Sequence, residues 1–292
     1  MSRPQALPIL GAEIWEPVEV ARDMDGVKHA VAFASGKGGV GKSTCTVNVA
    51  LALRYLGLTV GVLDADIYGP SVAHMLGVPP GQRPEAAPDD QMYPVEALGI
   101  RSMSMAYLTT ERTPLVWRGP LAGGALAQLL AKTAWGELDC LLIDMPPGTG
   151  DIQLTLTQKI ALSGVVIVTT PQEVALLDAR KGIEMFQKVE VPLLGIIENM
   201  AFFRCSECGQ KEPIFGVDGG ERVAAEYGSK VLAQVPLAPV ICDDADRGAP
   251  SVARDPESPV AAPYLNAARN LMAALEEKRV SSVGPAIHVS DD

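Results

Sequence analysis

The chain has 292 residues, of which 48% are hydrophobic and 20% charged, a composition typical of a globular protein with a large buried core. It carries 24 Lys and Arg against 35 Asp and Glu, and the net charge of −11 disfavours nucleic acid as main partner because counterion release requires a basic surface. No apolar run approaches the roughly 20 residues that span a bilayer, and the N-terminus lacks a secretory signal pattern. The five sparse cysteines suit a reducing compartment, so we expect a cytoplasmic protein without a membrane partner.

Strands and helices are predicted to alternate along most of the chain. Short apolar runs indicate buried strands at 29–35, 59–63, 139–143, 165–169, 193–197 and 230–235. Segments of helical length lie at 43–56, 121–132, 152–162, 173–189 and 220–227. Nearly continuous apolar strands separated by helices predict an α/β fold, with a mostly parallel sheet covered by helices on both faces.

The segments between these elements are less regular. Residues 77–90 are rich in Pro and Gly and are predicted to form a surface loop, and 92–105 is expected to add one or two strands at a sheet edge. Residues 243–259 are polar and typical of turns, whereas 263–277 carries the apolar stripe of a last helix.

A single domain is predicted to lie between two irregular ends. The proline-containing residues 1–27 have no sustained period and are expected to form an extended arm, and 279–292 is expected to be a disordered tail. The domain between them covers 28–278.

A phosphate-binding loop follows the first predicted strand and opens the first predicted helix. The segment 36–43 matches G-x-x-x-x-G-K-[ST], the P-loop of nucleotide triphosphatases. Glycines let backbone N–H groups approach phosphate oxygens, Lys42 reaches the β and γ phosphates, and Ser43 can bind Mg²⁺. The expected nucleotide contacts are Gly36, Lys37, Gly38, Gly39, Val40, Gly41, Lys42, Ser43 and Thr44.

The loop contains a second lysine, Lys37, directly after its first glycine. One interpretation is a solvated lysine on an exposed loop. The other is that Lys37 crosses a dimer interface and adds positive charge beside the transferred phosphoryl group of the partner's nucleotide.

Aspartates close two of the predicted strands, where open parallel sheets bind their ligands. Asp64 and Asp66 follow the second strand, and Asp144 ends another and could hold Mg²⁺ through water, as a Walker B residue does. The Pro- and Gly-rich segment 146–150 suits a switch that senses the γ-phosphate. Helix capping is the alternative for such aspartates, and for Asp151 it is at least as good an explanation as catalysis.

Together GKGGVGKST, DAD and DMPPGTGD resemble the deviant Walker A ATPases, the class that includes MinD, ParA and the nitrogenase iron protein. The combination of DADIYGPS, DMPPGTGD, ENMAFF and a nearby Cys-x-x-Cys is similar to one branch, the Mrp/ApbC iron–sulfur cluster carriers. The resemblance runs from about Val31 to Pro239. It implies that Lys37 is the signature lysine acting across a dimer, while Lys42 and Ser43 bind phosphate and Mg²⁺.

The same resemblance implies roles for residues beyond the loop. Asp66 would position the attacking water, and Asp64 and Asp144 would lie in the outer shell of the metal. Asn199 resembles the residue that reads the adenine edge, with the backbone around Pro236 beside the base. From the residues alone, Asn199 could equally be an asparagine in a turn.

Cys205 and Cys208 form a Cys-x-x-Cys pair. Two thiolates are half of the usual four ligands of zinc or a [4Fe–4S] cluster, and Cys45, Cys140 and Cys242 are poor candidates to complete the set. A two-fold symmetric homodimer would bring two pairs together. We favour a bridging [4Fe–4S] cluster, and a bridging zinc and a redox or structural dithiol stay open as alternatives.

The leading hypothesis is therefore a slow, ATP-hydrolysing homodimer that carries a [4Fe–4S] cluster to apo iron–sulfur client proteins. The alternative is a MinD- or ParA-like positioning or partitioning ATPase, which would need a basic patch or a Lys/Arg-rich amphipathic helix. The last predicted helix ends in EEKR and the tail in SDD, so neither feature is strong. A reductase like the nitrogenase iron protein is disfavoured because it expects two widely separated cysteines per chain.

Overall fold

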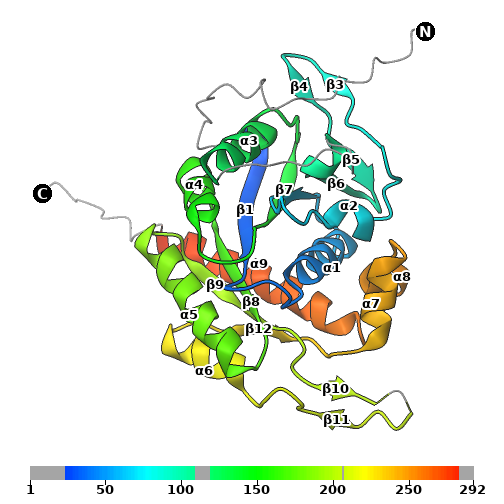
Figure 1. Ribbon diagram of the computed structural model, residues 1–292, viewed down its shortest axis with the longest axis vertical. Coiled ribbons are helices and arrows are strands. Elements are labelled where there is room, and N and C mark those ends of the chain that lie inside the picture. Colours follow the sequence, from blue (N-terminus) through cyan, green and yellow to red (C-terminus); the bar gives the residue numbers. More distant parts are fainter. Residues whose placement is uncertain (1–23, 109–118, 206, 283–292) are drawn as a thin grey trace, which may run out of the picture.

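The computed structural model describes residues 24–108, 119–205 and 207–282 (Figure 1). In this part of the chain eight strands form one sheet in the order β12-β9-β8-β1-β7-β2-β6-β5. Every neighbouring pair is parallel except β5 and β6 at the edge, which confirms the predicted sheet. The strands are β1 (Val27–Ala34), β2 (Val60–Asp64), β5 (Val95–Ala97), β6 (Ile100–Ser104), β7 (Leu138–Asp144), β8 (Gly164–Thr169), β9 (Leu193–Glu198) and β12 (Val231–Gln234).

Helices cover both faces of the sheet, as the apolar strands predicted (Figure 1). Alternation along β1 shows why: Val31 and Phe33 pack in one core, and Ala32 and Ala34 pack in the other. The first core is covered by α1 (Lys42–Tyr55), α2 (Val72–Met75), α7 (Pro239–Asp246), α8 (Ser251–Arg254) and α9 (Ala262–Ser282). The second is covered by α3 (Gly119–Ala131), α4 (Asp151–Lys159), α5 (Glu173–Lys188) and α6 (Gly219–Glu226).

The register of the central strands brings their carboxyl ends level. Phe33 of β1 lies opposite Asp144 of β7, and Asp64 of β2 lies opposite the same Asp144. The loop after β1 therefore begins beside both strand-end aspartates, which are buried. This edge of the sheet is where the candidate site forms.

The chain beyond β12 differs from the turn-rich segment predicted for 243–259, because the second half of α7 and all of α8 lie within it. Its polar residues are used inside the fold: buried Asp244 accepts a hydrogen bond from the Ser251 hydroxyl at 2.9 Å and pairs with Arg254 at 3.2 Å. The predicted edge strands within 92–105 are found as β5 and β6.

The two ends of the chain lie mostly outside the described residues. Residues 1–23 of the expected arm and 283–292 of the expected tail belong to this part. The last helix is longer than predicted, since α9 runs from Ala262 to Ser282. None of the helices in the described ranges combines the length and apolarity needed to cross a membrane.

Two short hairpins complete the described structure. One pairs β3 (Ala86–Ala87) with β4 (Gln91–Met92) next to the sheet edge. The other pairs β10 (Phe203–Arg204) with β11 (Lys211–Glu212) and extends away from the body of the sheet (Figure 1). The second hairpin carries the Cys-x-x-Cys pair in its turn.

Candidate functional site

The phosphate loop links β1 to α1 and needs glycine for two different reasons. Gly39 and Gly41 have φ angles of 82° and 79°, in the left-handed region that side chains rarely adopt. At Gly36 the reason is space, because a Cβ would overlap the backbone of Asp178 in α5. The loop therefore takes a path that only glycine allows, with its backbone close to α5, at the N-terminus of α1 where anions bind favourably.

Lys42 does not point into open solvent but pairs with Asp144. Their Nζ and Oδ1 atoms are 2.7 Å apart, and the side chains are only 6% and 0% exposed. The Ser43 hydroxyl donates to Asp144 Oδ2 at 2.5 Å and the Thr46 hydroxyl donates to Oδ1 at 2.9 Å. A carboxylate beside a serine hydroxyl at the start of the helix is a donor set that suits Mg²⁺ bound through oxygen and water.

Asp64 and Asp66 lie on the next strand and on the segment that follows it. Buried Asp64 accepts backbone N–H groups of Ser71 at 3.1 Å and Val72 at 3.2 Å, so it holds the start of α2. Burial, followed by the charge of Asp144, raises the pKa of Asp64 to about 7. Asp66 lines the cavity described next, and its Oδ1 accepts the Gly69 N–H at 3.2 Å.

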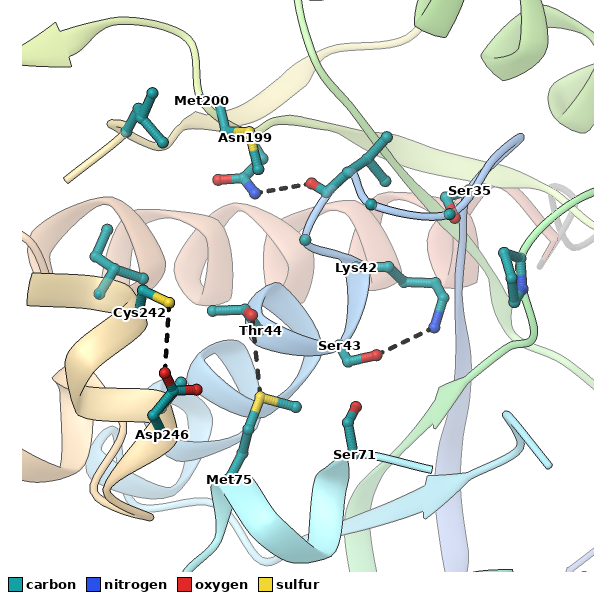
Figure 2. Close-up of a pocket in the computed structure, with 18 of the residues that line it drawn as sticks. Ser35, Lys42, Ser43, Thr44, Ser71, Met75, Asn199, Met200, Cys242 and Asp246 are labelled. Carbon is teal, nitrogen blue, oxygen red and sulfur yellow. Dashed lines mark hydrogen bonds between the residues drawn. The ribbon is translucent and has the colours of Figure 1, made fainter. Parts of the chain in front are cut away.

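A cavity of about 440 Å³ extends from the phosphate loop toward α7 (Figure 2). The loop from Lys37 to Thr44 lines one end, and Asn199, Pro236 and Leu237 line the side formed by β9 and β12. Cys242 and Asp246 of α7 line the far end, where the thiol donates to the carboxylate at 3.7 Å. Neither residue was predicted as part of the site, because no helix was predicted over α7: Asp246 falls in the predicted turn-rich segment 243–259, and Cys242 directly precedes it.

Asn199 contacts the phosphate loop directly, which the sequence did not predict. Its Nδ2 donates to the backbone carbonyl of Val40 at 2.8 Å (Figure 2). Asn199 lies in the same cavity as Pro236, as expected, but the hydrogen bond that its side chain makes here is to the loop.

The predicted switch segment is also tied to the loop. The Gly148 N–H donates to the carbonyl of Ser35 at 3.0 Å, and the Gln153 amide donates to the carbonyl of Pro146 at 2.6 Å. Lys37 lines the cavity and, within the described part of the chain, forms no ion pair. The predicted switch segment is thus hydrogen-bonded to Ser35, the residue directly before the phosphate loop.

Cys205 and Cys208 lie in the turn of the β10–β11 hairpin, half-buried and exposed respectively. The turn is closed by the Cys205 N–H, which donates to the Gln210 carbonyl, and by the Gly209 N–H, which donates to the Cys205 carbonyl, both at 3.0 Å. Hydrogen bonds from the backbone of Cys208 and then Glu207 lower the pKa of the Cys205 thiol. The turn thus favours a thiolate, the form that binds metals.

Within the described residues, one chain supplies this single pair of thiol ligands at the hairpin. Among the described residues no three His, Cys, Asp or Glu side chains gather as a metal site. Cys45 and Cys140 are buried, and burial raises the pKa of both thiols. Cys242 lies in the cavity, where the charge of Asp246 raises its pKa.

The root of the hairpin is hydrogen-bonded to the cavity wall. The Leu237 N–H donates to the carbonyl of Phe202 at 2.8 Å, and Phe203 forms a parallel bridge with Leu237. Leu237 itself lines the cavity. The segment that carries the thiols is therefore bonded to a residue of the cavity wall.

Comparison with known proteins agrees with this geometry. Over residues 26–272 the chain matches the family model described as ParA, NUBPL iron-transfer P-loop NTPase. An iron-sulfur cluster carrier protein of Pseudomonas fragi is 58% identical over 238 residues, covering 82% of this chain and 83% of that one. A nucleotide-binding protein of Archaeoglobus fulgidus in complex with ADP is 38% identical, with a TM-score of 0.70 over 81% of this chain and 91% of that chain. The cell division ATPase MinD of Pyrococcus furiosus, 22% identical, shares the fold with a TM-score of 0.61 over 84% and 99% of the two chains.

Proposed function

Because the chain belongs to the family of NUBPL iron-transfer P-loop NTPases, we propose that it is an ATP-hydrolysing carrier of iron–sulfur clusters. In this proposal two chains form a homodimer, hold one [4Fe–4S] cluster between them and transfer it to apo iron–sulfur proteins. The name of the Pseudomonas fragi relative supports the cargo, and the ADP complex of the Archaeoglobus fulgidus relative supports the nucleotide.

The observation that carries the proposal is the Cys205–Cys208 turn. Its backbone N–H groups favour the thiolate of Cys205, and Cys208 is exposed to an approaching partner. A [4Fe–4S] cluster takes four cysteine ligands in the usual case, so two such turns complete one coordination sphere. A two-fold axis supplies the second turn without a second kind of protein. Zinc held by the same four thiolates is the alternative occupant.

The proposal gives the nucleotide site separate residues for binding and for hydrolysis. Lys42 and the loop N–H groups would hold the β and γ phosphates, and Ser43 with Asp144 would hold Mg²⁺ directly and through water. The metal would neutralise charge on the transferred phosphoryl group. Asp66 would orient the attacking water, and Lys37 would reach the nucleotide of the partner subunit. The proposal assigns no described side chain as a dedicated base, so we expect slow turnover.

The nucleotide would act on the cluster through the cavity wall. Asn199 touches the phosphate loop, and six residues later Cys205 begins the thiol turn. Between them Phe202 is bonded to Leu237 at the base end of the cavity. A nucleotide that moves this wall would alter how the two thiol turns face each other, which is the kind of coupling that a transfer protein needs.

We place the protein in the cytoplasm, where its thiols stay reduced. With a net charge of −11, we expect neither nucleic acid nor a membrane surface among its partners. A MinD-like positioning function has less support, because the likeness to Pyrococcus furiosus MinD extends to the fold alone.

The proposal is tested by cluster loading and transfer with a matched cysteine control. After anaerobic reconstitution, the wild type should carry iron and sulfide and reactivate the apo form of a [4Fe–4S] enzyme. Cys205→Ser with Cys208→Ser should bind less than a tenth of that iron, because no thiolate remains at the turn. Cys140→Ala, which removes a buried thiol of β7, should load and transfer like the wild type. Full iron retention by the double variant would refute the site.

A further inference from the structure

We propose that Asn199 is a positioning residue for the phosphate loop. The family resemblance of the sequence implies that this asparagine binds the edge of the adenine base. Here its amide nitrogen instead donates to the Val40 carbonyl at 2.8 Å, between residues 159 positions apart in the chain. The inference concerns phosphate binding alone, so its failure would leave the proposed cluster site untouched.

The backbone of Asn199 is fixed from both sides. Its N–H donates to the carbonyl of Thr169 at the end of β8, at 2.8 Å. On the other side Val235 donates to the carbonyl of Glu198 and accepts from the N–H of Ala201, at 2.9 and 3.0 Å. The residue is only 6% exposed. Because its backbone is fixed by these bonds, Asn199 can hold the Val40 carbonyl of the loop in one position.

Gly41 shows how closely the amide approaches the loop. A Cβ at this position would overlap Nδ2 of Asn199, so the amide occupies the space that any larger residue would need. Gly41 also has a φ of 79° and precedes α1, whose first turn begins with the Cys45 N–H bonded to the Gly41 carbonyl. Two independent constraints therefore require glycine where Asn199 meets the loop.

The hydrogen bond sets the direction of the next peptide group. In a trans peptide the carbonyl of Val40 and the N–H of Gly41 point in opposite directions. Holding the carbonyl toward Asn199 aims the Gly41 N–H the other way, where a phosphate oxygen can accept it. Without Asn199 the buried carbonyl would lose its partner, and the peptide would be free to rotate. The backbone position of Lys42, which follows Gly41, would then be less well defined.

The acceptor end of the amide remains available to a base. The Val40 carbonyl can only accept a hydrogen bond, so the amide nitrogen must face the loop, and Oδ1, on the other side of the same amide group, points away from the loop (Figure 2). Asn199 thus joins the base side of the cavity to the phosphate side. Reading of adenine by Oδ1 and positioning by Nδ2 are separable, because only the second affects a ligand without a base.

The test uses Mg²⁺ with inorganic tripolyphosphate, which has no base, alongside ADP. In calorimetric titrations Asn199→Ala should weaken both ligands about tenfold, the effect of losing one well-placed hydrogen bond. Amide hydrogen exchange at residues 40–45 should also become faster in the ligand-free protein. A loss confined to ADP, with unchanged tripolyphosphate binding and unchanged exchange, would overturn the inference.

Asn270→Ala is the matched control. Its Nδ2 donates to the carbonyl of Leu232 at 2.8 Å, the same kind of bond between α9 and β12, away from the cavity. This variant should bind both ligands like the wild type, and equal losses in the two variants would mean that the effect is only general destabilisation. Should Asn199→Ala fail to fold, Asn199→Ser removes the same donor while keeping a polar side chain, and the same results decide.

Discussion

At the scale of single residues, two buried charges of the candidate site are paired with each other. Lys42 is paired with Asp144, and the Ser43 and Thr46 hydroxyls donate to the same carboxylate. Both charged groups are nearly removed from water, so each depends on the other. In the proposed function, binding of nucleotide and Mg²⁺ would break this ion pair. Lys42 would then bind the phosphates, and Asp144 would bind the metal through water.

Removing one partner of this ion pair should destabilise the ligand-free fold. Lys42→Met leaves Asp144 buried without a counter-charge, and we expect the free energy of unfolding to fall by about 3 kcal/mol. Adding Asp144→Asn should recover most of that loss, since neither charge then remains. Urea denaturation without nucleotide measures both variants.

Lys37→Met is the control for the same loop. Because Lys37 forms no ion pair in the described part of the chain, its replacement should change the free energy of unfolding by less than about 0.5 kcal/mol. An equal loss in Lys37→Met and Lys42→Met, or no recovery in the double variant, would contradict the role given to the pair.

At the scale of elements, the sequence predicted the parts with strong local signals. These parts are the phosphate loop, the strand-end aspartates and the Cys-x-x-Cys pair. Each is marked by a short run of residue types that is rare outside sites of its kind. Helix α7 escaped prediction because its second half is polar and its buried Asp244 is held by Ser251 and Arg254, which come later in the chain. Asn199 was predicted as a site residue, but its contact with the phosphate loop was not, since its partner Val40 is 159 positions away in sequence.

Three central strands are joined at their amino ends by Asp139 of β7. Its carboxylate pairs with Lys28 of β1 at 2.6 Å and accepts from the N–H and hydroxyl of Thr59, which precedes β2, at 2.8 and 2.7 Å. The hydrogen bond from Lys28, followed by that from the Thr59 backbone, holds the pKa of Asp139 well below its usual value of 3.8. The ionised carboxylate therefore stabilises the folded state above the unfolded pKa, and this stabilisation is lost as the pH falls toward the folded pKa.

Asp139→Asn should lower the free energy of unfolding by about 1 kcal/mol at pH 7, a modest value because the site is partly exposed. The difference from wild type should shrink as the pH is lowered below about 4. Urea denaturation between pH 7 and pH 3.5 measures it. Asp90→Asn, which breaks an exposed pair with Lys132, should have a smaller effect. A difference that is independent of pH would contradict the role of the charge.

At the scale of the whole molecule, the thiol turn and the nucleotide cavity are two ends of one segment. The chain leaves β9 at Asn199, passes Phe202 beside Leu237 and reaches the turn at Cys205. The proposed dimer depends on contacts between two copies of the chain, because each copy supplies half of the shared site. The sequence could count the thiols, but only geometry between chains can complete the coordination sphere.

Native mass spectrometry of the anaerobically reconstituted protein tests the central claim most directly, because it counts chains and iron in the same particle. We predict two chains with four irons and four sulfides, and a metal-free species when Cys205 and Cys208 are both serine. A single chain that carries a complete cluster, or a pair of chains that keeps its iron without these cysteines, would contradict the shared site.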